Sequence, residues 1–135
     1  MIFIDADAFI GLSYEYDVHS VTAVDLFVKL TDLKVELFTS WDVVDEVATK
    51  LSQFATKSTA EGFLNFLKNS EIEVKFTDLS VSKKAVDLFK KQTSKNVSLT
   101  DCANMVIAKD LGIDTIFSFD KHYKQNGFKL LQDTI

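Results

Sequence analysis

Four acidic residues stand where short structural elements are expected to begin or end. Asp5 closes the apolar run of MIFID, and Asp120 follows the apolar run of TIFSF. Glu46 lies early in one helical pattern, and Asp101 opens another. Carboxylates are the ligands that hard cations such as Mg²⁺ and Mn²⁺ prefer, and clustered carboxylates repel each other without a cation. The four positions therefore predict a divalent-metal site.

The elements that must hold these acids alternate between strands and helices, which predicts an α/β domain with parallel strands. Strands are expected at residues 1–5, 35–39, 71–77, 114–119 and 128–131, and helices at residues 7–16, 20–33, 41–54, 59–68, 80–92 and 98–111. Ligands of an open parallel sheet bind beyond the carboxyl ends of its strands. Asp5 and Asp120 both follow such ends.

The composition predicts a single domain over residues 1–135 in a reducing compartment. With 47% hydrophobic residues, including 12 Phe, the 135-residue chain can bury a sizeable core, and we expect the Phe residues at helical spacing to belong to it. The lone Cys102 has no partner for an internal disulfide, and we expect it in the core. No apolar run approaches the ~20 residues that cross a bilayer. We therefore expect a cytoplasmic protein with no membrane partner.

The charged and small residues exclude several functions. A net charge of −5 argues against a simple basic surface for nucleic acid. All 15 basic residues are Lys, so base-specific contacts by Arg are excluded. With no Pro and only 4 Gly, the chain has no Gly-rich phosphate-binding loop. Nucleotide-cofactor enzymes of those kinds are therefore excluded.

Each acid also has a structural explanation. Asp5 either caps the following helix or points into the crevice as a ligand. For Asp7 we favour a helix-capping acid, stabilised by the helix dipole, over an acceptor beside the metal. Glu46 lies four residues before Lys50, a spacing that stabilises a helix by ~0.2–0.5 kcal/mol without any function.

Asp101 is expected to combine two roles. It can complete a capping arrangement with Ser98, three residues earlier. The helical wheel sets it opposite an apolar stripe that includes Leu99 and Cys102, at a helix end where backbone dipoles attract anions. Asp101 can therefore both cap the helix and bind a metal.

Asp120 either ends its strand in a turn or belongs to the site. The basic neighbours Lys121 and Lys124 favour the site, because they can form a phosphate-contacting rim. We expect His122 to be a loop residue and not a ligand, since a site of hard oxygen ligands does not need imidazole. His19 is expected to have no role.

Together these segments resemble the PIN-domain ribonucleases, particularly the small VapC toxins of type II toxin–antitoxin pairs. The family pattern has an Asp after the first strand, a Glu early in a mid-chain helix, an Asp opening a later helix after Ser or Thr, and an Asp after the next strand. In this sequence they are Asp5 in FIDAD, Glu46 in VVDEV, Asp101 in SLTDCANMVIAKDLG and Asp120 in FSFDKHY. The chain departs from the pattern at Ala6 and Asp7, where the family commonly has Thr and then Asn or Ser.

The resemblance implies a three-layer PIN-like α/β fold, with a central, mainly parallel sheet flanked by helices. It implies an endoribonuclease dependent on Mg²⁺ or Mn²⁺ that leaves 5′-phosphate and 3′-hydroxyl ends on RNA. It also implies a homodimer and a small antitoxin partner. Asp5 and Asp101 would be the principal ligands, Asp120 a direct or water-mediated ligand, and Glu46 a ligand or a water-orienting group. The auxiliary positions would be Asp7, Thr100, Ser118 and His122.

Two alternatives remain open from the sequence. The segment FIDADAF also resembles the first motif of haloacid-dehalogenase-like phosphatases, with Asp5 as nucleophile and Asp7 as acid, although Asp120 lacks the acidic partner that such a site needs. A non-catalytic PIN-like module would bind only RNA or protein, although all four acids are retained here. Because clustered carboxylates repel each other without metal, removing these acids should leave the stability of the metal-free protein unchanged or raised.

Overall fold

The strand order places the first and fourth strands side by side in the sheet. The computed structural model describes residues 1–135. Its elements are β1 (Ile2–Ile4), α1 (Ala6–Ser13), α2 (Ser20–Asp32), β2 (Leu37–Ser40), α3 (Trp41–Phe54), α4 (Lys57–Lys68), β3 (Glu73–Lys75), α5 (Leu79–Lys91), α6 (Leu99–Asp110), β4 (Thr115–Phe117), α7 (His122–Gln125), β5 (Lys129–Leu130) and the 3₁₀ helix η1 (Leu131–Asp133). The strands form one sheet of order β3-β2-β1-β4-β5, and every pairing is parallel.

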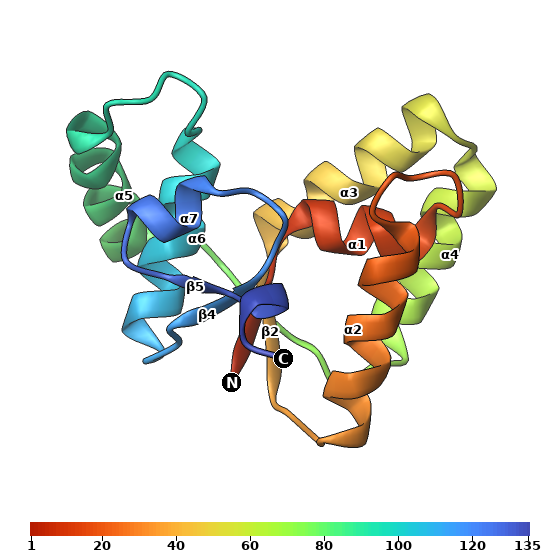
Figure 1. Cartoon of the computed structure of the whole chain (residues 1–135). Coiled ribbons are helices and arrows are strands. Elements are labelled where there is room, and N and C mark those ends of the chain that lie inside the picture. Colours follow the sequence, from red (N-terminus) through yellow and green to blue (C-terminus); the bar gives the residue numbers. More distant parts are fainter.

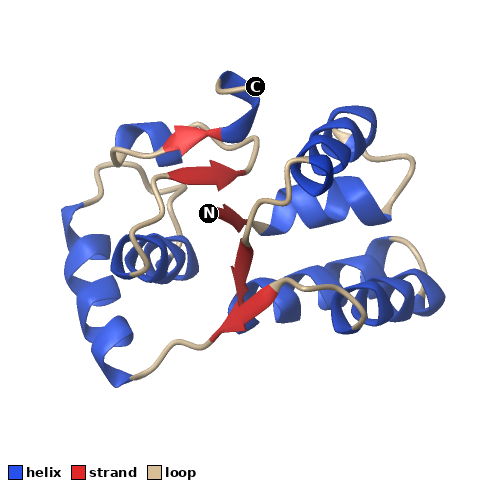
Figure 2. Cartoon of the chain, turned by 90° about the horizontal axis from the view of Figure 1, so that it is seen from below, coloured by secondary structure: helices blue, strands red, loops and turns tan.

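Helices cover both faces of this sheet. Helices α1 to α4 lie on one side, and α5 and α6 lie on the other (Figures 1 and 2). Helices α1 and α3 pack against each other on the first side, while α5 packs against α6 on the second. The three-layer α/β arrangement expected from the sequence is therefore confirmed.

The helix starts follow the capping residues of the sequence. Ser40, the last residue of β2, accepts a hydrogen bond from the backbone N–H of Val43 and so starts α3, as predicted. Helix α1 starts one residue earlier than predicted, because Asp5 caps it, and it ends earlier than predicted, because the backbone is extended again at Tyr14. Helix α7 was not predicted, since four residues are too few to show a helical period.

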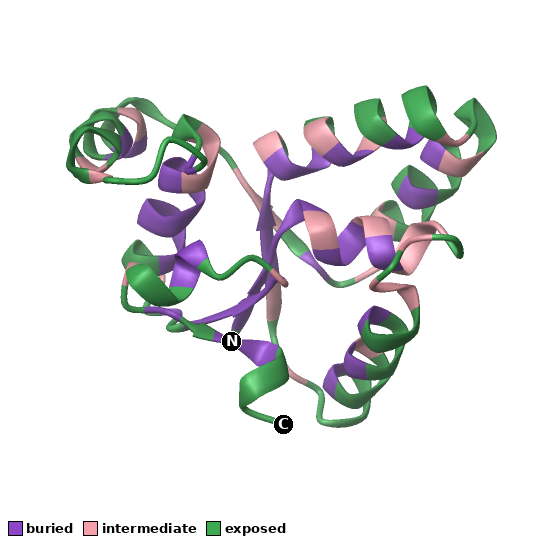
Figure 3. Cartoon of the chain, turned by 45° about the horizontal axis from the view of Figure 1, so that its top comes forward, coloured by how far each residue is buried: buried purple, intermediate pink, exposed green.

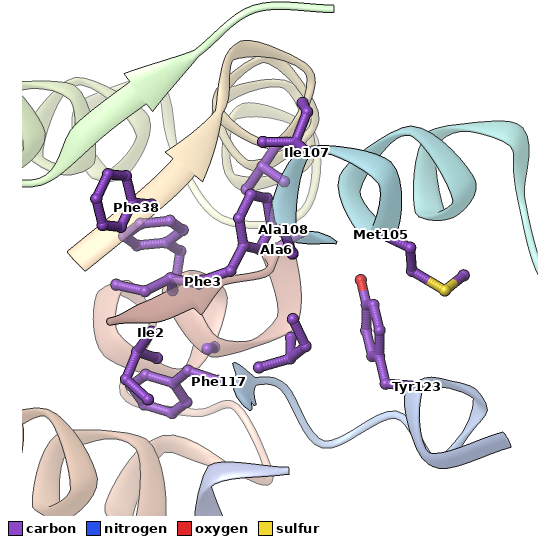
Figure 4. Packing of buried hydrophobic residues seen from close by; sticks show 14 of the residues in the cluster. Ile2, Phe3, Ala6, Phe38, Met105, Ile107, Ala108, Phe117 and Tyr123 are labelled. Carbon is purple, nitrogen blue, oxygen red and sulfur yellow. The ribbon is translucent and has the colours of Figure 1, made fainter. Parts of the chain in front are cut away.

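The core lies on both faces of the central strands, and all three residues of β1 are buried (Figure 3). This burial confirms the interpretation of the continuous apolar run at residues 1–5. Cys102 is fully buried, also as predicted. Figure 4 shows Tyr123 among the core residues near Met105, with its ring buried.

The prediction that the Phe residues belong to the core is wrong for part of them. Phe54, Phe66 and Phe89, which lie in helices, are exposed. Their helices have only one face against the body of the protein, so rings on the other face meet solvent or pair with another ring. Phe66, for example, packs edge-on against Phe27 at 5.6 Å between ring centroids. No helix has the length and apolar character needed to cross a bilayer.

Candidate active site

The acids meet at the carboxyl edge of the parallel sheet. Because β1 and β4 are neighbours, the backbone N–H of Asp5 donates to the carbonyl of Phe117 at 3.1 Å, and Asp120 follows three residues later. Helix α6 starts close by, because the carboxylate of Asp101 lies 3.6 Å from Nε2 of His122, whose Nδ1 lies 2.7 Å from Asp120. The structure thus brings three of the four predicted acids to one edge.

Asp5 is buried and uses both carboxylate oxygens inside the protein. One oxygen caps α1 by accepting from the N–H of Ala6 at 2.8 Å, and the other accepts from the hydroxyl of Tyr123 at 2.6 Å. The pKa of Asp5 is raised from 3.8 to about 7, mainly by burial and also by the charges of Asp7 and Asp101, which together outweigh the lowering effect of these hydrogen bonds. Asp5 is therefore a helix cap that also belongs to an acidic cluster.

Asp7 does not have the role predicted for it. Asp5 is the N-cap of α1, whereas the Asp7 carboxylate accepts from the hydroxyl of Ser118 at 3.0 Å and the N–H of Phe119 at 2.8 Å. Its other oxygen is buried without a hydrogen-bond partner. Burial is the main cause that raises the pKa of Asp7. This acid ties α1 to the loop after β4, because the pairing of β1 with β4 sets that loop beside it.

Asp101 forms the predicted capping box. Its carboxylate accepts from the N–H of Ser98 at 2.9 Å, and the Ser98 hydroxyl accepts from the N–H of Asp101 at 3.0 Å. The Asp101 side chain is 19% exposed, so its outer surface remains open to the edge. Leu99, which the wheel placed on the buried stripe, is instead exposed because it lies at the very start of the helix.

His122 is not the loop residue that the sequence predicted. It begins α7, is buried, and its Nδ1 lies 2.7 Å from the Asp120 carboxylate. Its Nε2 lies 3.6 Å from Asp101, too far for a hydrogen bond, and has no other partner. The imidazole is held in this place because the Asp120 carboxylate also accepts from the backbone N–H of His122. His122 therefore stands between two of the predicted acids.

Ser118 connects two acids at the end of β4. Its hydroxyl donates to Asp7 and accepts from the backbone N–H of Asp120 at 3.1 Å. His19, for which no role was expected, lies flat on Phe119 with 4.1 Å between ring centroids. The loop that carries Asp120 is thus fixed on both sides.

Glu46 lies apart from the buried cluster. It pairs with Lys50 at 3.0 Å, as its spacing allowed, and its side chain is 39% exposed. It lines a shallow groove of about 390 Å³ together with other polar residues, which are Asp42, Asp45, Thr49, Lys50, Gln53 and Thr100. Thr100 joins this groove to the start of α6, next to Asp101. Glu46 therefore lies in a groove next to the acid cluster and has a surface partner of its own.

The site fits a hard divalent cation by its chemistry, although its acids are not gathered around one point. No three acidic, His or Cys side chains lie close enough to share an ion. The donors are nevertheless carboxylates, burial and neighbouring acidic charges raise the pKa of Asp5 and Asp7, and one oxygen of Asp7 is buried without a partner. A divalent cation would relieve this repulsion. The side chains that would hold it are Asp5, Asp101 and Asp120, after exchanging internal hydrogen bonds for metal contacts.

Sequence reasoning missed two polar residues beside the acids. Tyr123 holds Asp5, and Asn104 accepts from the Ser40 hydroxyl at 2.6 Å while its own amide nitrogen has no partner. An Asn within the apolar run CANMVIA was a visible signal, because a buried amide needs hydrogen-bond partners. Nothing in the spacing of Tyr123 indicated its contact with Asp5.

Replacing Tyr123 with Phe should lower the free energy of unfolding by about 1–3 kcal/mol, because a buried oxygen of Asp5 would lose its donor. Urea denaturation at neutral pH measures this change. Tyr16→Phe is the matched control, since Tyr16 is 78% exposed and the same substitution should change stability by less than ~0.5 kcal/mol. Equal losses in the two variants would mean that the bond to Asp5 contributes nothing.

These features define a PIN-like α/β domain with acids at the carboxyl edge of its sheet. Among solved structures, the fold matches the crystal structure of VapC20 from Mycobacterium tuberculosis, described as a toxin that cleaves the sarcin–ricin loop. The TM-score is 0.83 over 95% of this chain and 96% of that one, with 19% sequence identity. At this identity the likeness shows a shared fold. No protein-family model matches the chain, and no curated protein matches its sequence.

Proposed function

We propose that this chain is a divalent-metal-dependent endoribonuclease and the toxin of a toxin–antitoxin pair. The buried acid cluster carries the proposal: Asp5 has a pKa of about 7 because burial, Asp7 and Asp101 all oppose its charge. Such a cluster at the carboxyl edge of a parallel sheet is typical of a cation site. The shared fold with an RNA-cleaving toxin supports the choice of RNA as substrate.

The proposed reaction is hydrolysis of a phosphodiester bond. When bound, Mg²⁺ or Mn²⁺ would activate a water molecule and stabilise the charge on the leaving oxygen. Asp5 and Asp101 would be the principal ligands, and Asp120, kept in orientation by His122, a direct or water-mediated one. Glu46 would orient water from the groove, with the Thr100 hydroxyl beside it. The products would carry 5′-phosphate and 3′-hydroxyl ends.

The partners follow from the same proposal. As a toxin, the chain would form a homodimer and be inhibited by a small antitoxin with basic residues that cover the acidic groove. A cytoplasmic location would supply RNA and keep Cys102 reduced. One domain over residues 1–135 would carry all of these contacts.

Cleavage of structured RNA by the purified protein tests the proposal. We expect cutting in Mn²⁺ or Mg²⁺, none in EDTA, and recovery when the metal is restored, because hydrolysis requires the cation. Product ends can be read by their response to phosphatase and to polynucleotide kinase. Robust turnover of a phosphate monoester that is lost in Asp7→Asn would instead support the phosphatase alternative.

A further inference from the structure

Two exposed aromatic rings stack on each other at the carboxyl edge of the sheet. Trp41 is 51% exposed and Phe76 is 66% exposed, and their ring centroids lie 6.1 Å apart with an angle of 22° between the planes. Large aromatic side chains usually bury most of their surface. Here a nearly parallel pair keeps much of its surface open to solvent.

The strand register sets this pair beside the acid cluster. Phe3 lies opposite Phe38 on β2, so two residues further on Asp5 lies beside Ser40. Ser40 in turn lies opposite Lys75 on β3. Trp41 and Phe76 are the next residues after these two. Since neighbouring strands are ~4.8 Å apart, Phe76 lies about two strand spacings, or roughly 10 Å, from the row of Asp5.

Hydrogen bonds fix the segments that carry both rings. The hydroxyl of Thr77 donates to the carboxylate of Asp42 at 2.7 Å, which ties the segment after β3 to the first turn of α3. Ser40 caps the same helix just before Trp41 and also donates to Asn104 of α6. The pair is therefore ordered before any ligand binds, which lowers the entropy cost of binding.

We propose that Trp41 and Phe76 form a stacking platform for an unpaired nucleobase of the RNA substrate, next to the scissile phosphate. This assignment rests on the proposed function. Aromatic rings hold bases of single-stranded RNA by stacking and need no particular sequence. The chain has no Arg, so a guanidinium cannot supply this contact. Asp42, which accepts from Thr77, and Asp45, four residues after Trp41 on α3, both line the groove, so the groove begins next to the platform.

Stacking also suits the charge of this surface. Asp42, Asp45 and Glu46 line the groove next to the platform, and without a cation they repel phosphate. A neutral ring contact attracts the base without regard to that repulsion. Unpaired nucleotides, whose bases are free to stack on the two rings, should therefore bind more tightly than a duplex.

Intrinsic fluorescence gives a direct test, because Trp41 is the one Trp of the chain. The probe is an unstructured oligouridylate of about 12 nucleotides, within the site sizes of stacking platforms. Titration in Ca²⁺, with the absence of cleavage checked on gels, should quench the fluorescence of Trp41 to saturation. Anisotropy of a labelled copy should give the same Kd. A duplex of the same length should quench little.

Variants measure the contribution of each ring. Trp41→Ala and Phe76→Ala should raise the Kd roughly 5- to 150-fold, the range for loss of one stacked base, whereas Trp41→Phe should keep most of the affinity. The matched control is Phe66→Ala, because Phe66 is also part-exposed and paired with another ring but lies in α4, away from the acids. It should leave the Kd unchanged.

Two results would overturn the platform. One is binding of the oligonucleotide without any quenching of Trp41, and the other is an unchanged Kd in Trp41→Ala. If Trp41→Ala had a smaller oligomeric mass in solution than the wild type but the same Kd, the rings would instead contact a second copy of the chain. Metal-dependent cleavage by the wild type is scored separately, so the platform can fail while the nuclease activity stands.

Discussion

Replacing Asp101 with Asn is expected to reduce RNA cleavage in Mn²⁺ by roughly a hundredfold or more. Asp101 faces the edge where Asp5 lies, and its charge contributes to the raised pKa of Asp5. An amide has nearly the same shape but no charge, so it binds a hard cation far more weakly. Rates with saturating RNA over a range of Mn²⁺ concentrations measure the loss.

Asp101→Asn removes the charge of the carboxylate but keeps its role in capping α6. An Asn side-chain oxygen can still accept from the backbone N–H of Ser98, so the cap of α6 is retained and stability should change by less than about 1 kcal/mol. Asp110→Asn is the matched control, since Asp110 ends the same helix and pairs with Lys84 on the surface. Calorimetric titration with Mn²⁺ gives a readout independent of cleavage. Equal cleavage by Asp101→Asn and wild type would assign the activity to another site or to a contaminant.

The sequence predicted the strand ends well, because an apolar run that stops at an acid marks both a buried strand and its exposed end. Residues 1–5 and the run before Asp120 are of this kind. The capping signals of Ser40 and Ser98 also acted locally, through bonds to residues three positions away. Features that depend on residues close in the sequence could therefore be predicted without knowing the fold.

Contacts between segments that lie far apart in the sequence could not be predicted in this way. The roles of Asp7, His122 and Tyr123 depend on β1 lying beside β4, which sets the loop after β4 and α7 against the start of α1. The exposure of Phe76 likewise depends on β3 being the edge strand of the sheet. Hydrophobic spacing gives the face of an element, but it does not give the neighbour that the face meets.

The metal-free protein should become less stable as the pH rises from about 4 to about 7.5. In the folded state the pKa of Asp5 is about 7, above its ordinary value of 3.8, mainly because of burial. The folded state therefore binds more protons than the unfolded state between these two values. The stabilisation that protonation of Asp5 gives is fully present below its ordinary pKa of 3.8, and it is lost as the pH rises through its folded-state pKa of about 7. For Asp5 alone this difference corresponds to on the order of 4 kcal/mol.

Asp5→Asn should remove most of that slope. Urea denaturation in EDTA at about pH 4.5, 6 and 7.5 measures the free energy of unfolding of both proteins. The variant should resemble the wild type at the lowest pH and exceed it at the highest, in line with repulsion among the acids. Asp25→Asn serves as the control, because Asp25 pairs with Lys29 on the surface and should follow the wild-type slope.

Adding Mn²⁺ at the highest pH should reverse the order of the two proteins. A cation bound only by the folded state stabilises the wild type by about 2.7 kcal/mol at a concentration of 100 times its Kd. The variant, which lacks a ligand, should gain much less. Since Asp5 would then be an ionised ligand in the folded state, the wild-type slope should also flatten. If Asp5→Asn were strongly destabilising at every pH, with or without Mn²⁺, the carboxylate would be a structural cap of α1 and not a metal ligand.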